Sequence, residues 1–137
     1  MERKIIETIL KINNRCLSER EKKEILKDLS PREAQVLVTL NPDEKLGSSD
    51  LAQRNALSPS RMSRIVDSLC KKNYLTRHSS EDDRRAIEIS LSPMGEEHRV
   101  ILINHSMNCE SNLRTRLSED QFNTVQDALN ILIKTME

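Results

Sequence analysis

Three side chains that can bind soft metal ions lie on one stripe of a single predicted helix. His105 and Cys109 are four residues apart, and His98 precedes His105 by seven residues. This spacing brings all three to one helix face, and imidazole and thiolate are ligands for zinc and copper. Because no acidic ligand accompanies them and structural zinc takes four ligands, we expect packing roles and no metal cofactor. The three residues are kept as the candidates should a metal be needed.

The cysteines Cys16, Cys70 and Cys109 are widely spaced and odd in number. Without a Cys-x-x-Cys pair they predict neither a disulfide framework nor a zinc ribbon. Cys16 follows Arg15, and a neighbouring cation favours the reactive thiolate, so oxidant sensing is one hypothesis for it. The alternative, which we favour, is a small buried apolar side chain. The sequence leaves open whether any of the three senses oxidants.

The segment from Ser58 to Lys72 has the pattern of an amphipathic helix. Apolar side chains recur at spacings of three and four residues and predict a stripe that faces the core. The members of this stripe are Met62, Ile65, Val66, Leu69 and Cys70. The opposite face is either an ordinary solvated surface or a binding surface.

The opposite face of this helix carries hydroxyl and guanidinium groups that suit nucleic acid. A helix fits the major groove of DNA, and an arginine can donate to both acceptors of guanine there. The helix N-terminus and lysines near its end suit phosphate. The residues expected to contact DNA from this helix are Ser58, Ser60, Arg61, Ser63, Arg64, Lys71 and Lys72.

A short helix is predicted immediately before this segment. It covers Ser48 to Ala56, with Leu51, Ala52 and Ala56 directed inward, and Leu57-Ser58-Pro59 turns directly into the next helix. Two short helices joined by so tight a turn are typical of a helix-turn-helix.

A two-stranded hairpin is predicted downstream. Ile87, Ile89 and Leu91 alternate with polar residues, which is the pattern of a half-buried strand. Leu75-Thr76-Arg77 is its predicted partner, and the eight polar residues from His78 to Arg85 would form the tip, or wing.

Serine residues mark several other helix starts. Three Ser-Pro pairs, at positions 30, 58 and 92, combine an N-cap acceptor with proline at the first helical position. Capping boxes are present at Ser30 to Glu33 and at Ser118 to Gln121. The charge-rich stretch 18–28 is predicted as a loop followed by a short helical turn.

Charge is balanced overall but uneven along the chain of 137 residues, which holds 22 basic and 22 acidic side chains. Ser58 to Arg85 has seven basic and four acidic residues, whereas Ser92 to Glu137 has four basic and seven acidic residues. This distribution favours a single face that meets phosphate.

Motifs of the common enzyme classes are missing from the sequence. With only two glycines it has no phosphate-cradling glycine loop, and it has neither a nucleophile elbow nor a zinc hydrolase motif. We therefore expect a protein that is not an enzyme. No apolar run approaches membrane-spanning length, and the first residues do not have the pattern of a signal peptide. We expect a cytoplasmic protein.

The stretch from Leu57 to Glu97 resembles the MarR family of winged helix-turn-helix transcriptional regulators. The family pattern is matched by Val66-Asp67-Ser68-Leu69, Lys71-Lys72, Asp83-Arg84-Arg85 and Leu91-Ser92-Pro93-Met94-Gly95. Two positions depart from it: Asn73 stands where glycine is usual, and Ser92 where threonine is usual. Both departures are physically mild, and Asn73 can take the left-handed conformation that a helix C-terminus often needs.

The resemblance implies a mainly α (α+β) fold, with a two-stranded β wing and an N- and C-terminal helical dimerisation region. It also implies a homodimer whose recognition helices enter successive major grooves and whose wings enter the minor groove. By position, Arg85 would enter the minor groove, braced by Asp83, and Arg84 would contact phosphate. Asp67 is either a surface carboxylate or a brace for a wing arginine, and we favour the brace.

Apolar stripes near both ends of the chain predict a two-fold dimer. One stripe comprises Ile5, Ile9 and Ile12, and the other comprises Leu129, Leu132 and Met136. A small monomer does not offer either stripe enough apolar surface to pack against. Burying each of these side chains in a dimer would contribute about 1.5–3 kcal/mol of stabilisation. The expected organisation is a single domain over residues 1–137, with a DNA-binding part at about 30–92 and dimerisation parts at 1–17 and 93–137.

Together these features predict a homodimeric, sequence-specific regulator of transcription. It is expected to act as a repressor on a pseudo-palindromic operator in double-stranded DNA. A small-molecule or redox signal could release it, because the resemblance is to a family whose members often bind small aromatic anions. The alternative is a winged-helix module for protein–protein contact without specific DNA binding, which would use the face of Ser60, Arg61 and Arg64.

Overall fold

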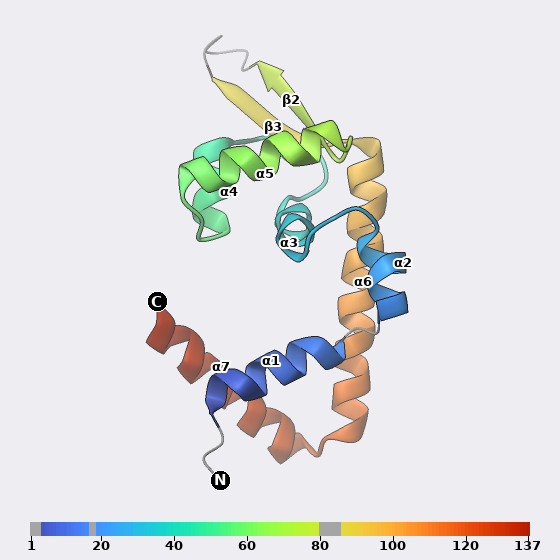
Figure 1. Cartoon of the computed structure of the whole chain (residues 1–137), viewed down its shortest axis with the longest axis vertical. Coiled ribbons are helices and arrows are strands. Elements are labelled where there is room, and N and C mark those ends of the chain that lie inside the picture. The colour runs from blue at the N-terminus through green and yellow to red at the C-terminus, as the bar shows by residue number, and fades with distance from the viewer. Residues whose placement is uncertain (1–3, 17–18, 80–85) are drawn as a thin grey trace. The chain divides into compact units, whose positions relative to one another are not determined.

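The computed structural model describes residues 4–16, 19–79 and 86–137, and only the backbone of residues 13–16 and 19 (Figure 1). The described residues are mainly helical, with one small antiparallel sheet, as predicted. In chain order the elements are α1 (Ile5–Cys16), α2 (Glu19–Leu26), α3 (Pro31–Thr39), β1 (Leu46–Gly47), α4 (Ser48–Arg54), α5 (Pro59–Lys71), β2 (Leu75–Ser79), β3 (Ile87–Leu91), α6 (Pro93–Arg116) and α7 (Glu119–Met136). The chain divides into two compact units, Met1–Ile103 and Asn104–Glu137, and the boundary falls inside α6.

The predicted capping boxes are present at α3 and α7. Ser30 Oγ accepts from the Glu33 N–H at 3.1 Å, while the Glu33 carboxylate accepts from the Ser30 N–H at 3.0 Å. Ser118 and Gln121 make the same reciprocal pair at α7. These bonds satisfy backbone donors that have no partner inside the helix, so both helix starts are encoded locally.

An aliphatic core holds the first unit together. Its fully buried large side chains come from α3, the residue that follows it, α4, α5 and β3: Val36, Leu37, Leu40, Leu51, Met62, Leu69 and Ile89. Each contributes about 1.5–3 kcal/mol when removed from water. The stripe predicted for α5 is confirmed, since three of its members are buried and Ile65 and Cys70 are partly buried. The core therefore decides which face of α5 stays outside.

Strand β3 lies between β1 and β2 in a three-stranded antiparallel sheet. The predicted hairpin of β2 and β3 is confirmed, with Leu75 opposite Leu91. Strand β1 adds a third strand, with Leu46 opposite Ile89. Strand β1 was not predicted from the sequence, because two residues are too few to show an alternating pattern.

The segment Glu19–Leu26 forms the helix α2, which corrects the predicted loop and short turn. Arg20 donates to Glu24 one turn further on at 3.1 Å, and the two apolar side chains at the end of α2 pack against the core. A helix with so few apolar residues shows little periodicity in the sequence, and tertiary packing completes it.

The second unit contains the end of α6 and the whole of α7. Among its described residues none is buried. Leu129 is 44% and Met136 is 75% exposed, and Leu132 is half-buried. Helix α7 therefore carries apolar surface that its own unit does not cover.

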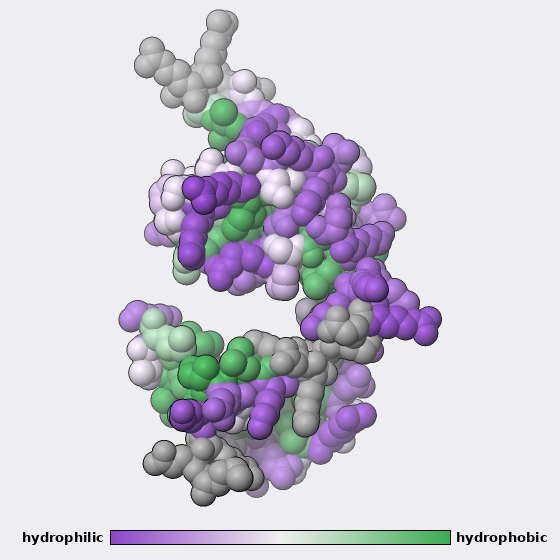
Figure 2. Space-filling model, viewed as in Figure 1, coloured by the Kyte–Doolittle hydropathy of each residue, from purple (hydrophilic) through white to green (hydrophobic). Residues whose placement is uncertain are grey.

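Helix α1 has a similar apolar surface. Ile5 and Ile12 are exposed, and Ile9 is half-buried. Exposed side chains of this kind account for green areas on the surface in Figure 2. Across the described ranges we find no helix with the length and apolar character needed to span a membrane.

Candidate nucleic-acid interface

Helices α4 and α5 are joined by a tight turn, as a helix-turn-helix requires. Ala56 takes a positive φ of 53°, and the Leu57 N–H donates to the Ala52 carbonyl at 2.9 Å. Ser58 Oγ then accepts from the Arg61 N–H at 3.3 Å and caps α5. Ala56 is exposed, which corrects its predicted inward position, because it belongs to the turn and not to the helix.

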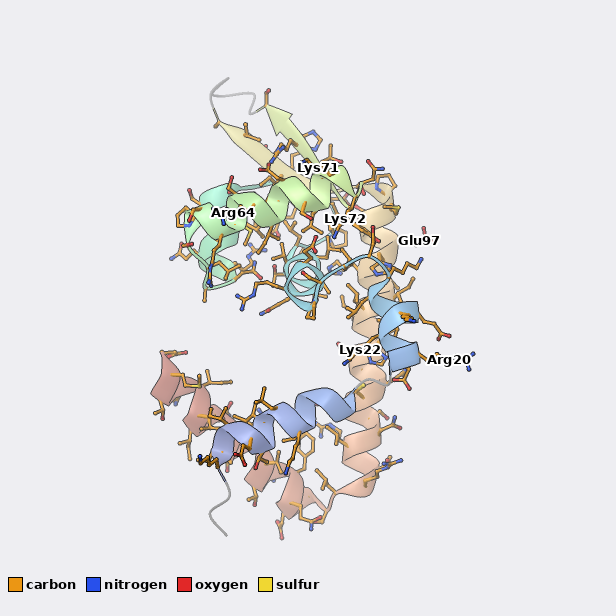
Figure 3. All side chains as sticks on the ribbon, in the orientation of Figure 1. Arg20, Lys22, Arg64, Lys71, Lys72 and Glu97 are labelled. Atoms are coloured by element: carbon orange, nitrogen blue, oxygen red, sulfur yellow. The ribbon has the colours of Figure 1, made fainter. Side chains whose placement is uncertain are left out.

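The outer face of α5 is polar and exposed. The exposed residues are Ser58, Ser60, Arg61, Ser63, Arg64 and Lys71. Arg64 lies in the first half of the helix and Lys71 at its end (Figure 3). The visible surface over α5 is mostly hydrophilic (Figure 2). This helix can therefore present two guanidinium groups and several hydroxyls to a polar partner.

Asp67 on α5 forms an ion pair with Arg77 on β2. The hydrogen bond to Asp67 holds the pKa of the Arg77 guanidinium above its ordinary value. This contact fits the interpretation of Asp67 as a brace for a wing arginine, and the arginine lies on a strand of the wing. The pair links α5 to the hairpin.

Of the predicted wing tip, His78 and Ser79 extend strand β2, which corrects their prediction as tip residues, and the rest lies outside the described residues, with Asp83, Arg84 and Arg85. The predicted roles of Arg85 in the minor groove, of Arg84 at phosphate and of Asp83 as a brace stay predictions. Within the described part of the hairpin, His78 Nε2 and Ser90 Oγ lie 2.7 Å apart, and this contact joins the two strands that lead to the tip.

Lys72 is engaged inside the protein, unlike Lys71. Its ammonium donates to both carboxylate oxygens of Glu33 at 3.1 Å and to the Asp28 carbonyl oxygen at 2.6 Å. Lys72 is half-buried and Lys71 is exposed, and Figure 3 shows both at the end of α5. A phosphate would have to compete with a buried carboxylate for Lys72. Both phosphate contacts stay predictions, and the exposed Lys71 is the more accessible of the two lysines.

The segment from α3 to β2, which contains the helix-turn-helix, matches a family of known regulators in sequence. The model of the MarR family matches residues 27–86. The HTH-type transcriptional regulator SarZ of Staphylococcus epidermidis is 30% identical over 102 residues, which cover 74% of this chain and 68% of SarZ. The chain belongs to the MarR family.

Solved structures share this MarR fold at lower sequence identity. The MepR–DNA complex of Staphylococcus aureus gives a TM-score of 0.79 at 16% identity, covering 98% of this chain and 99% of MepR. FabT of Streptococcus pneumoniae in complex with DNA gives 0.77 at 22% identity, covering 96% and 94%. These likenesses confirm the predicted winged helix-turn-helix fold.

The structure explains both departures from the MarR pattern. Asn73 follows α5 with a φ of 67°, so asparagine takes the left-handed conformation for which glycine is usual. Ser92 Oγ accepts from the Gly95 N–H at 2.9 Å and donates to the Asn73 carbonyl, so a serine hydroxyl suffices there. A Cβ at Gly95 would overlap the Tyr74 carbonyl, which is why this position of the MarR pattern needs glycine.

His98, one of the three metal candidates, is only 3% exposed. Its ring packs on Tyr74 with centroids 5.4 Å apart, and it forms a hydrogen bond with the backbone of Ile25. Its Nε2 has no hydrogen-bond partner among the described residues. Burial lowers the pKa of His98 below its ordinary value, so the imidazole is neutral near pH 7.

The other metal candidates contact each other, with Cys109 Sγ 3.4 Å from His105 Nε2. No group of three or more His, Cys, Asp or Glu side chains suited to a metal ion occurs where the chain is described. Cys70 and Cys109 are free thiols, and burial raises the pKa of the Cys70 thiol. The side chain of Cys16 is outside the described part. That the protein needs no metal or other cofactor stays a prediction.

No pattern in the sequence predicted the contacts that hold the end of α5. Ser68 Oγ donates to the Glu33 carboxylate at 2.9 Å, and the Tyr74 hydroxyl donates to Asp28 Oδ1 at 2.7 Å. These partners are 35 and 46 residues apart, so no local spacing reveals them. The one signal in the sequence that points to these contacts is the capping-box residue Glu33, because a carboxylate that becomes buried requires hydrogen-bond or charged partners.

Proposed function

We propose that this protein is a sequence-specific DNA-binding regulator, without enzymatic activity, that represses transcription as a homodimer on a pseudo-palindromic operator. The observation that carries the proposal is the exposed polar face of α5, whose opposite face is packed into the core. MepR and FabT, which share the fold, have structures in complex with DNA, and this supports the same role here.

We assign base recognition to the first two turns of α5. Arg61 and Arg64 would donate to guanine in the major groove, with Ser60 and Ser63 beside them. The capped N-terminus at Ser58 and the ammonium of Lys71 would contact phosphate. In the wing, Arg85 would enter the minor groove, braced by Asp83, and Arg84 would contact phosphate.

We assign dimerisation to the apolar surfaces of α1 and α7. Each surface is exposed within its own unit, and a second copy would supply the missing apolar partner. A two-fold dimer contains two recognition helices that are related by its axis. Half-sites related by the same two-fold axis follow from that geometry.

A small-molecule or redox signal would release the operator. Cys16 and Cys109 are the thiol candidates for a redox signal. Cys70 is disfavoured, because its raised pKa lowers the fraction of reactive thiolate. A regulator of this kind meets its operator in the cytoplasm.

The test is to select genomic DNA fragments with the purified full-length protein and to sequence them. We expect a motif of two inverted half-sites about one helical turn apart, bound in a gel-shift assay in preference to a scrambled duplex. A reporter under that operator distinguishes repression from activation. Selection that enriches no motif would favour the protein–protein module instead.

A further inference from the structure

A buried carboxylate joins the end of α5 to the start of α3. Glu33 is 7% exposed. Its oxygens accept from the Ser30 N–H at 3.0 Å, the Ser68 hydroxyl at 2.9 Å and the Lys72 ammonium at 3.1 Å. Ser68 and Lys72 lie one turn apart at the end of α5, so one carboxylate attaches two of its side chains to another helix.

The residues just before α3 reinforce this attachment. Lys72 also donates to the Asp28 carbonyl at 2.6 Å, and the Tyr74 hydroxyl donates to the Asp28 carboxylate at 2.7 Å. All of these groups belong to the first compact unit. Removing one partner of a buried ion pair leaves an uncompensated charge, so Glu33 and Lys72 depend on each other.

We infer that Glu33 is a positioning residue, which acts through Lys72 and Ser68 to fix the orientation in which α5 presents Arg61 and Arg64 to DNA bases. The inference rests on the proposed function. Base readout requires each donor to reach a base edge within hydrogen-bond distance, so a small tilt of α5 weakens it. Nonspecific binding depends mainly on charge and tolerates such a tilt.

The variant Glu33→Gln separates this role from helix capping. Gln121 closes the capping box of α7, so glutamine can cap α3 in the same way. The substitution removes the negative charge that holds Lys72 and replaces the oxygen that accepts from Ser68 with an NH2 donor, while the remaining oxygen can still cap α3.

The matched control is Glu44→Gln. Glu44 accepts from the Asn41 N–H at 3.2 Å and from Arg54 at 2.6 Å. Like Glu33, it therefore binds one backbone donor and one cationic side chain. This ion pair attaches the end of α4, the other helix of the helix-turn-helix.

The first measurement compares affinity for the selected operator with affinity for a scrambled duplex at one salt concentration. We expect Glu33→Gln to weaken operator binding about tenfold, as the loss of a charged hydrogen bond would. Scrambled-duplex binding should change less than about twofold. A protein that is merely less stable would lose both in parallel. Parallel losses, or an equal operator-specific loss in Glu44→Gln, would overturn the inference.

The second measurement tests the route through Lys72. In a Lys72→Met background, Glu33→Gln should weaken operator binding less than it does in wild type, because residues that act together are not additive and only the contact with Ser68 remains to be lost. An undiminished effect in that background would overturn the inference.

The third measurement needs no DNA and therefore separates this inference from the proposed function. Amide hydrogen exchange in the last turn of α5 should be faster in Glu33→Gln than in wild type and Glu44→Gln. If wild type enriches no operator but this exchange responds, the proposed function fails and the attachment stands. Unchanged exchange would overturn the attachment even where operator binding succeeds.

Discussion

The two compact units differ in how far they bury their apolar side chains. The first buries an aliphatic core built from α3, α4, α5 and β3, whereas no described residue from Asn104 onward is buried. Yet α7 is as clearly specified in the sequence as α3, with the same kind of capping box. Local signals therefore define a helix without defining what covers it, and for the second unit we assign that role to another copy of the chain.

Replacing both Leu129 and Leu132 with aspartate should break the second unit's proposed contact. It removes two apolar side chains worth about 1.5–3 kcal/mol each and places charge in the interface. We expect monomers in sedimentation velocity, with weak operator binding. Asn123→Asp, an exposed change on the same helix, should remain dimeric. A wild-type protein that sediments as a monomer at micromolar concentration would contradict the dimer.

Leu69→Ala should instead damage the first unit. Leu69 is fully buried in the core, so we expect the free energy of unfolding to fall by about 2–5 kcal/mol through lost burial and a cavity. Urea denaturation measures this loss. The exposed Ser63→Ala should change stability by less than about 0.5 kcal/mol. Equal effects of the two variants would mean that this core is not formed.

Arg61→Ala and Arg64→Ala should change DNA binding without changing assembly. Each should cost about 1–3 kcal/mol on the best operator and relax preference at particular base pairs. A panel of operator variants in fluorescence anisotropy reports both effects. Arg20→Ala, at an exposed ion pair on α2, is the control. Unaltered affinity and preference in both α5 variants would make protein contact the leading function.

His98 should make the first unit sensitive to acid. Because burial lowers its pKa in the folded protein, the unfolded chain binds more protons between that pKa and the ordinary value of about 6.5. This contribution to the free energy of unfolding is full above about pH 6.5 and declines as pH falls toward the folded pKa. The charged groups around His98 are of both signs, from Lys27, Asp28 and Glu97.

Urea denaturation at several pH values tests this dependence. His98→Phe keeps a ring beside Tyr74 and removes the titration, so it should flatten the fall in stability on the acid side of neutrality. A pH dependence that persists unchanged in His98→Phe would assign the effect to other groups.

The smallest expected difference separates Lys71 from Lys72. Lys71→Ala should reduce the slope of log affinity against log salt by about one, since one phosphate contact releases about one counterion. Lys72→Met should leave the slope unchanged, because its ammonium is bound to Glu33. Operator titrations at several salt concentrations measure both slopes. Equal reductions would indicate that Lys72 leaves Glu33 when DNA binds.

Features that depend on neighbours within about four residues were predictable from the sequence. They include the caps at Ser30, Ser58 and Ser118, the apolar stripe of α5 and the left-handed Asn73. Their physical basis is local, because a cap bonds the same turn and a stripe follows from helical periodicity.

Features that depend on packing between distant segments were not predictable in this way. Helix α2 has little periodicity and its apolar end packs on a core made elsewhere, and β1 exists only because β3 lies beside it. Asp67 was predicted to brace a wing arginine, but the identity of that arginine, Arg77, depends on how β2 packs on α5.

The two lysines at the end of α5 show most clearly how far the sequence alone can predict side-chain contacts. The sequence by itself determined that both lie near the end of a polar helix face, since helical spacing fixes direction around the axis. Only the tertiary structure decided that Lys72 meets Glu33, 39 residues away, while Lys71 stays exposed. The reason is that a helix specifies where its side chains point, but the neighbouring element that folding brings there determines what they meet.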